Sequence, residues 1–218
     1  MKIEKQIAKL PPYNANLYVK KTISGSFYYD SNDLLIRANI FRNGISHDSL
    51  STKAKTYVDL IMSIECSLKS MIISLSSKNE SPEDAYLKAR RCSHNLDKLY
   101  IEVKIRAKNR IKLLSKESEA ILIKANSLGV GYRYNITSFM FISQESWADR
   151  GPRKGKVSSI LNHNFINQLT VVASQMMKIA SKANEKYLGR YGNINTGKWE
   201  ETEYRHTKFV TNLGKQFS

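Results

Sequence analysis

The stretch HDSLSTKAKTYVDLIMSIECSLKSMIISLSS, residues 47–77, decides the fold class. Its apolar side chains recur at the spacing of an α-helix and cover a wide stripe of that helix. The stripe consists of Leu50, Ala54, Tyr57, Val58, Ile61, Leu68, Met71, Ile72 and Leu75. A stripe of this width needs burial against several neighbouring helices, so the stretch predicts a helical bundle. The predicted core includes Leu50, Tyr57, Ile61, Leu68, Ile72, Leu96, Leu99 and Val103.

Other helical patterns flank the long one on both sides. Residues 31–44, SNDLLIRANIFRNG, begin with a capping side chain and end at Gly44, a common helix stop. In residues 81–91, SPEDAYLKARR, Ser81 can cap the helix while Pro82 takes the first helical position, and an acid follows in the capping-box place. Further helices are expected over residues 93–114 with Ser93 as the cap, over residues 115–129 ending at Gly129, and over residues 157–192.

Two segments lack a helical pattern. Residues 16–23, NLYVKKTI, alternate weakly and predict a short strand within a basic, aromatic lead-in of residues 1–30. Residues 130–143, VGYRYNITSFMFIS, are rich in β-branched and aromatic side chains and predict extended chain or a short hairpin. We therefore expect a mainly α-helical bundle over residues 31–190 as a single domain, followed by a polar and aromatic C-terminal segment over residues 191–218.

The composition indicates a polyanionic partner. The chain has 35 Lys and Arg against 19 Asp and Glu, which gives a formal net charge of +16. Both halves of the chain share the excess, so no basic tail accounts for it, and the folded body should carry a positive field. Such a field favours polyanions, most often RNA or DNA. The alternative is a surface whose lysines serve solubility alone.

The same composition argues against several other classes of protein. No apolar run approaches the roughly 20 residues of a membrane span, and MKIEKQIAKLPPYN lacks the features of a secretory signal. Cys66 and Cys92 belong to no paired ligand motif, which favours a reducing cytoplasm over a disulfide framework. The four histidines, His47, His94, His163 and His206, are dispersed. We therefore expect a cytoplasmic protein with no metal, no cofactor and no membrane partner.

Residues 63–100, SIECSLKSMIISLSSKNESPEDAYLKARRCSHNLDKLY, resemble the core of the HEPN superfamily, a group of all-helical, nucleotide-binding domains. As in that family, Glu65 is followed four residues later by Lys69 within an apolar helix. A second motif, of the type His-Asp-Leu-x-x-Leu, begins at His94 and opens the next helix. Asn95 replaces the acid that is usual at its place.

The resemblance spans about residues 45–140, and Arg133 in YRY is similar to an Arg-Tyr pair that follows the core in some members. Glu65 and Lys69 also have a meaning independent of the family, because buried charges persist only when they are paired. A polar link from this pair to His94 would fix the register of two helices. We expect these three residues to form a structural polar cluster at a helix–helix contact, in preference to a catalytic site.

Many HEPN members are metal-independent endoribonucleases, some from toxin or antiphage systems, and the resemblance implies the same activity here, with a site shared across a homodimer. Their signature is an arginine, four to six residues, and then a histidine. Arg42, Asn43 and His47 in RNGISH have this spacing. An imidazole can move the proton of a 2′-hydroxyl and a guanidinium can stabilise charge on the phosphate. Against this, the family usually has the motif later in the bundle, and Gly44 interrupts it here. The alternative is two surface residues that flank a turn.

A second candidate is the loop DRGPRKGK, residues 149–156, which precedes the last predicted helix. Its cations are Arg150, Arg153, Lys154 and Lys156. A flexible cationic loop before a helix start is suited to phosphate, and a solvated loop is the alternative. Aromatic residues that could stack on unpaired bases are Tyr132, Tyr134, Trp147, Trp199 and Tyr204.

Three functional hypotheses remain open at this point. The first is an RNA-cleaving, HEPN-like effector, and the second is a non-catalytic HEPN-like module that binds nucleic acid or a partner protein. The third is a structural DNA-binding protein of phage or plasmid origin. Binding of RNA or DNA is common to the first and third and belongs to one form of the second, so binding is the main expectation and cleavage is secondary.

Overall fold

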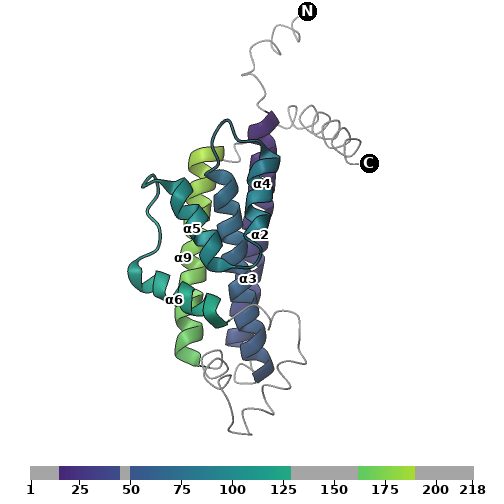
Figure 1. Ribbon diagram of the computed structural model, residues 1–218. Helices are drawn as coiled ribbons and strands as arrows, with labels where there is room; N and C mark the ends of the chain where they lie inside the picture. The colour runs from purple at the N-terminus through teal and green to yellow at the C-terminus, as the bar shows by residue number, and fades with distance from the viewer. Residues whose placement is uncertain (1–14, 45–49, 129–161, 190–218) are drawn as a thin grey trace, which may run out of the picture. The chain divides into compact units, whose positions relative to one another are not determined.

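The computed structural model of the chain describes residues 15–44, 50–128 and 162–189, and every regular element in these ranges is an α-helix. The helices are α2 (Ala15–Asn43), α3 (Leu50–Ser74), α4 (Pro82–Arg91), α5 (Leu96–Ala107), α6 (Lys116–Leu128) and α9 (His163–Leu188). The three long helices α2, α3 and α9 lie side by side, and the shorter ones pack against them (Figure 1). The prediction of a mainly α-helical bundle is confirmed.

Helix α2 contains the segment that was predicted to be a strand, so that prediction is wrong. Residues 16–23 lie in its first turns, and the helix continues without a break past residue 30. Its buried residues include small side chains at seven-residue intervals, namely Ser24, Ser31 and Ala38, beside Lys20 and Leu35. Serine and alanine differ little in hydrophobicity from the exposed residues beside them, so the helical period of α2 is weak in the sequence. Tertiary packing nevertheless makes the whole segment a helix.

Serine hydroxyl groups join α2 to the antiparallel α3. Ser24 Oγ donates to the Ser70 carbonyl at 2.9 Å, and Ser70 Oγ donates to the Ser24 carbonyl at 2.9 Å. About two turns further along α2, Ser31 and Ser63 make the same reciprocal contacts at 2.9 and 2.8 Å. Ser67 Oγ also lies 2.7 Å from Ser31 Oγ. Bonds from side chain to opposing backbone require the two helix axes to approach closely, which only small side chains allow.

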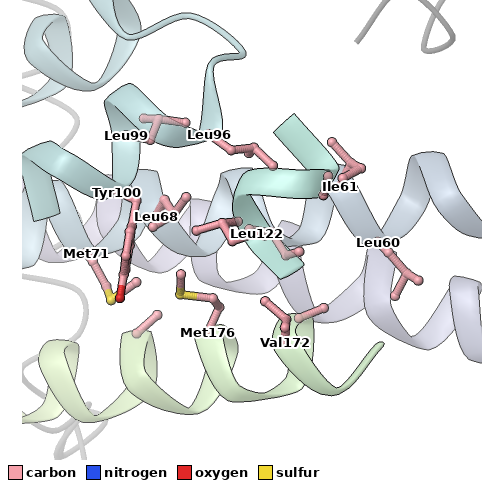
Figure 2. Close-up of a cluster of buried hydrophobic side chains, with 14 of the residues drawn as sticks. Leu60, Ile61, Leu68, Met71, Leu96, Leu99, Tyr100, Leu122, Val172 and Met176 are labelled. Carbon is pink, nitrogen blue, oxygen red and sulfur yellow. The ribbon is translucent and has the colours of Figure 1, made fainter. Parts of the chain in front are cut away.

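The opposite face of α3 contributes large apolar side chains to the core. Side chains from α3, α5, α6 and α9 converge there, and Figure 2 shows Leu68, Leu99, Leu122 and Met176 among them. Seven of the predicted core residues are buried, which confirms them: Tyr57, Ile61, Leu68, Ile72, Leu96, Leu99 and Val103. The side chain of Leu50 lies outside the described part.

The start of α4 is as predicted, whereas the start of α5 is different. Ser81 Oγ accepts the Asp84 N–H at 3.0 Å, and Pro82 occupies the first position of the helix. The prediction that Ser93 caps the next helix is wrong, because Ser93 adopts a positive φ of 52° in the preceding turn. Asn95 caps α5 instead, and its side-chain oxygen accepts the N–H three residues on at 2.9 Å.

Helix α5 is also shorter than predicted, since it ends at Ala107 instead of continuing through residue 114. Lys108 and Asn109 adopt left-handed backbone conformations, with φ of 41° and 62°. Asparagine tolerates this region better than most residues, and two such residues in succession end a helix. Residues 110–115 therefore form a connection to α6.

The helix predicted over residues 157–192 is shorter in the structure, because α9 begins at His163 and ends at Leu188. Asn162 caps α9, because its side-chain oxygen accepts the Phe165 N–H at 3.1 Å. At the other end Gly189 has a φ of +77°, a conformation that favours glycine and commonly follows the last helical residue.

An ion-pair clamp holds the connection after α3 against α5. Arg106 donates from two guanidinium nitrogens to the two carboxylate oxygens of Glu80 at 2.7 and 2.8 Å, and from Nε to Glu102 at 2.7 Å. The buried Lys20 of α2 donates to the Ser77 carbonyl at 2.8 Å in the same connection. This clamp ties α2, the connection and α5 together.

None of the helices in the described part has the length and apolar character that crossing a membrane would need. Neither Cys66 nor Cys92 forms a disulfide bond. Within residues 15–44, 50–128 and 162–189, no three His, Cys, Asp or Glu side chains gather as metal ligands would.

Replacing Ser31 by leucine should destabilise the protein by about 1–3 kcal/mol, because the added side chain has no space between α2 and α3. Ser26→Leu is the matched control, since Ser26 is an exposed serine of the same helix. Urea unfolding measures both variants. Equal stability of Ser31→Leu and wild type would contradict the close contact.

Acid should weaken the clamp at Glu80. The hydrogen bonds from Arg106 hold the pKa of Glu80 below its usual value of 4.5, against the opposing effect of burial. Because the pKa is lower in the folded state, the stability that Glu80 contributes is present above pH 4.5 and is lost as the pH falls through the folded-state pKa. In urea unfolding at a series of pH values, Glu80→Gln should therefore lose less stability on acidification than wild type. Parallel curves would show that the clamp contributes nothing.

Candidate nucleic-acid interface

A groove with a basic lining lies between the connection of residues 110–115 and the second half of α9. It is a hollow of about 610 Å³. Its cations are Arg110, Lys112, Lys178, Lys182 and Lys186, and all five are exposed. No acidic side chain is among the described residues that line it. We call this hollow, with these five cations, the basic groove.

Local structure explains how the five cations come together. Lys178, Lys182 and Lys186 are four residues apart, so they lie on one face of α9. The helix break before residue 110 turns the chain out of α5 and brings Arg110 and Lys112 to the facing wall.

Two of the cations are held in place around an aromatic ring. The guanidinium of Arg110 lies 5.1 Å from the centroid of the Tyr187 ring, and Lys186 Nζ lies 5.4 Å from it. Lys186 Nζ also donates to the Arg110 carbonyl at 3.0 Å, and Arg110 Nε donates to the Ala107 carbonyl at 3.3 Å. These contacts reduce the side-chain freedom that a bound anion would otherwise have to remove.

The basic groove combines a strong positive field with an apolar floor. Four apolar side chains line it beside the cations: Ile111, Leu113, Leu114 and Ile179. In a cleft whose charged groups all have one sign, the low dielectric constant of the apolar walls concentrates the electric field in the solvent at its mouth. A positive field of this kind attracts anions. Ser115 and Gln175 add polar groups at the rim. The arrangement suits a ligand that has several negative charges and some apolar surface.

The basic groove was not predicted from the sequence. The repeat of lysines at positions 178, 182 and 186 was visible in the sequence and is the signal that could have revealed one wall. The other wall could not be found in the same way, because residues 110–114 were assigned to a continuous helix.

The structure brings Glu65, Lys69 and His94 together. The Glu65 side chain is only 2% exposed, and Lys69 Nζ donates to its Oε1 at 2.7 Å. His94 Nδ1 lies 3.1 and 3.2 Å from the two carboxylate oxygens, so this nitrogen carries the proton in the contact. Because His94 belongs to the turn between α4 and α5, the cluster links that turn to the middle of α3.

Arg42 and Asn43 lie at the C-terminal end of α2, and His47 lies outside the described residues. Arg42 Nη1 donates to Asn167 Oδ1 of α9 at 3.3 Å. The imidazole that lines the same hollow as Arg42 is His163, a residue that spacing in the sequence did not connect with it.

The remaining predicted binding residues lie in segments that the structure does not describe. They are Arg133, Arg150, Arg153, Lys154 and Lys156, with the aromatic residues Tyr132, Tyr134, Trp147, Trp199 and Tyr204.

Comparison of the chain with protein-family models, curated proteins and solved structures finds no match.

The Glu65→Gln variant should be less stable than wild type by about 1–3 kcal/mol, because Lys69 and His94 lose a charged partner in a buried site. Asp33→Asn serves as the control, since Asp33 is an exposed carboxylate of α2 and its replacement should change the stability little. Chemical unfolding measures both. If the two variants unfold alike, the cluster does not stabilise the contact between α3 and the α4–α5 turn.

Proposed function

We propose that this protein is a HEPN-like helical bundle that binds RNA or DNA, and that the basic groove is its binding surface. The observation that carries the proposal is the set of five exposed cations around one hollow whose described lining contains no acid. Phosphate contacts by Lys and Arg release counterions from the nucleic acid, and this supplies most of the sequence-independent affinity.

The extent of the groove favours a polyanion over a small anion. Lys178 and Lys186 are eight residues apart, which corresponds to about 12 Å along the helix axis. A single phosphate cannot contact all three lysines of α9 and the two cations of the facing wall together. A nucleic-acid strand presents a row of phosphates, and its sugars and bases can contact the apolar floor of Ile111 and Ile179.

Two features support the HEPN-like part of the proposal. The polar cluster joins Glu65 and Lys69 of α3 to His94 in the turn before α5, and these are the positions that the resemblance singles out. The second feature is the all-helical architecture of the described residues. The proposal is one of binding and not of cleavage, because His47 of the predicted catalytic motif lies outside the described residues, and Arg42 donates to Asn167 of another helix.

Salt dependence provides the test. In Lys178→Gln/Lys182→Gln/Lys186→Gln protein, the slope of log affinity against log salt should be shallower by about 2–3, since each lost phosphate contact removes about 0.7–0.9. The measurement is fluorescence anisotropy with a labelled single-stranded RNA and a duplex DNA of mixed sequence. Discrimination among sequences should not change, because phosphate contacts do not read bases.

The matched control is the triple variant Lys78→Gln/Lys88→Gln/Lys98→Gln, which loses the same formal charge at exposed lysines outside the groove. It should keep the slope of the wild type. If both triple variants bind with the same affinity and slope, only net charge matters and the groove is not the site. If the wild type binds neither RNA nor DNA at low salt, a partner protein is the better hypothesis.

A further inference from the structure

A second polar hollow, of about 500 Å³, lies where the end of α2 meets the start of α9. Its described lining consists of Arg42, Asn43, His163 and Asn167, which supply one guanidinium, one imidazole and two amides. Arg42 and His163 are far apart in the sequence, and the antiparallel packing of α2 against α9 brings them to one place. We call this hollow the Arg42–His163 pocket.

The side chains of the pocket are arranged as hydrogen-bond donors. Arg42 is half-buried and donates from Nη1 to Asn167 Oδ1 at 3.3 Å. A guanidinium has five N–H groups, so this bond uses only one of them. The side-chain oxygen of Asn167 accepts this bond, so the two N–H groups of the amide take no part in it and can donate to another acceptor. His163 and Asn43 are exposed and add a ring nitrogen and a second amide at the rim.

In the described parts of α2 and α9, negative charge is remote from this pocket, and Asp48, which follows α2 in the sequence, lies outside the described residues. On α2 the nearest acid in the sequence is Asp33, and on α9 it is Glu185, near the opposite end of the helix. On α3, Asp59 accepts two hydrogen bonds from Arg37, from Nε at 2.7 Å and from Nη2. The neighbouring lysines are directed onto rings, with Lys55 5.9 Å from the Phe41 centroid and Lys124 4.8 Å from the Phe165 centroid.

A phosphate group fits these donors better than a carboxylate does. A guanidinium can bind two oxygens of either group through parallel hydrogen bonds. The imidazole and the amides line the same hollow as the guanidinium, and a tetrahedral phosphate has further oxygens that can accept from them. We propose that the Arg42–His163 pocket is an anion site that binds a phosphate group.

The pocket is separate from the basic groove. Both lie along α9, but Asn167 and Lys178 are eleven residues apart, or about 16 Å along the helix axis. The phosphate could therefore belong to a free mononucleotide or to the end of a strand that also contacts the groove. The proposal requires only the four residues of the pocket, so it can hold if the groove has no role in binding.

The test follows the His163 imidazole signals by nuclear magnetic resonance while inorganic phosphate is added to the full chain. The signals are assigned with the His163→Asn variant. In wild type they should move with saturation, and in Arg42→Gln the apparent Kd should rise at least about tenfold, as expected for loss of a charge-assisted pair. The groove variant Lys178→Gln/Lys182→Gln/Lys186→Gln should bind phosphate as wild type does. Unchanged far-ultraviolet circular dichroism and Tm would show that Arg42→Gln is folded.

Two further probes distinguish the sources of the phosphate. Adenosine 5′-monophosphate should move the His163 signals while adenosine should not. A short oligonucleotide with a 5′-phosphate should bind more tightly than the same oligonucleotide without it if the pocket takes a strand end, and equally if it takes a free nucleotide. The proposal is overturned if phosphate moves the His163 signals without saturation, or if Arg42→Gln binds phosphate as wild type does.

Discussion

The close contact between α2 and α3 is the constraint on which the rest of the structure depends. Serine side chains of each helix donate to backbone carbonyls of the other, as Ser24 and Ser70 do. Asn184 of α9 joins the same network, because its Oδ1 lies 2.5 Å from Ser24 Oγ, whose single proton the Ser70 carbonyl shares, and its side-chain N–H donates to Ser70 Oγ at 3.1 Å. Buried hydroxyls without partners would be costly, so a change in the register of the three helices would break bonds that stabilise the folded protein.

This register determines which face of α9 remains exposed. Leu169, Val172, Met176 and Ala180 are buried, and the network around Asn184 holds the C-terminal half of the helix in the same orientation. Lysines that repeat every four residues on the other side are therefore presented together. Their mutual repulsion is a cost to the folded protein, and a bound polyanion would offset it.

The parts of the fold that could be predicted are those for which local sequence and tertiary packing agree. The apolar stripe of α3 and the cap at Ser81 are such cases. The helix of residues 16–23 was missed because the buried residue in this stretch is Lys20 and Leu17 is exposed, so the stretch has no apolar stripe of helical period. The end of α5 at Ala107 was missed because the apolar period continues through residues 111–114, whose side chains pack against the core from a non-helical connection.

The candidate sites show the same division between local and long-range information. The contact of Glu65 with Lys69 follows from a spacing of four on one helix, and a motif pattern indicated His94 as the third member. The basic groove and the Arg42–His163 pocket each combine segments that are far apart in the chain. Spacing along the sequence cannot reveal such pairs, and the antiparallel packing of α2 against α9 is what creates the second one.

Lysine footprinting of the complex is the most direct measurement of the central claim, that nucleic acid lies in the basic groove. Limited acetylation of the free and the RNA-bound protein, read by mass spectrometry, reports which amines the ligand covers. The account predicts that Lys178, Lys182 and Lys186 become protected while Lys78 and Lys98 stay reactive. Protection confined to lysines outside the groove, such as Lys154 and Lys156, or equal protection of all lysines, would contradict it.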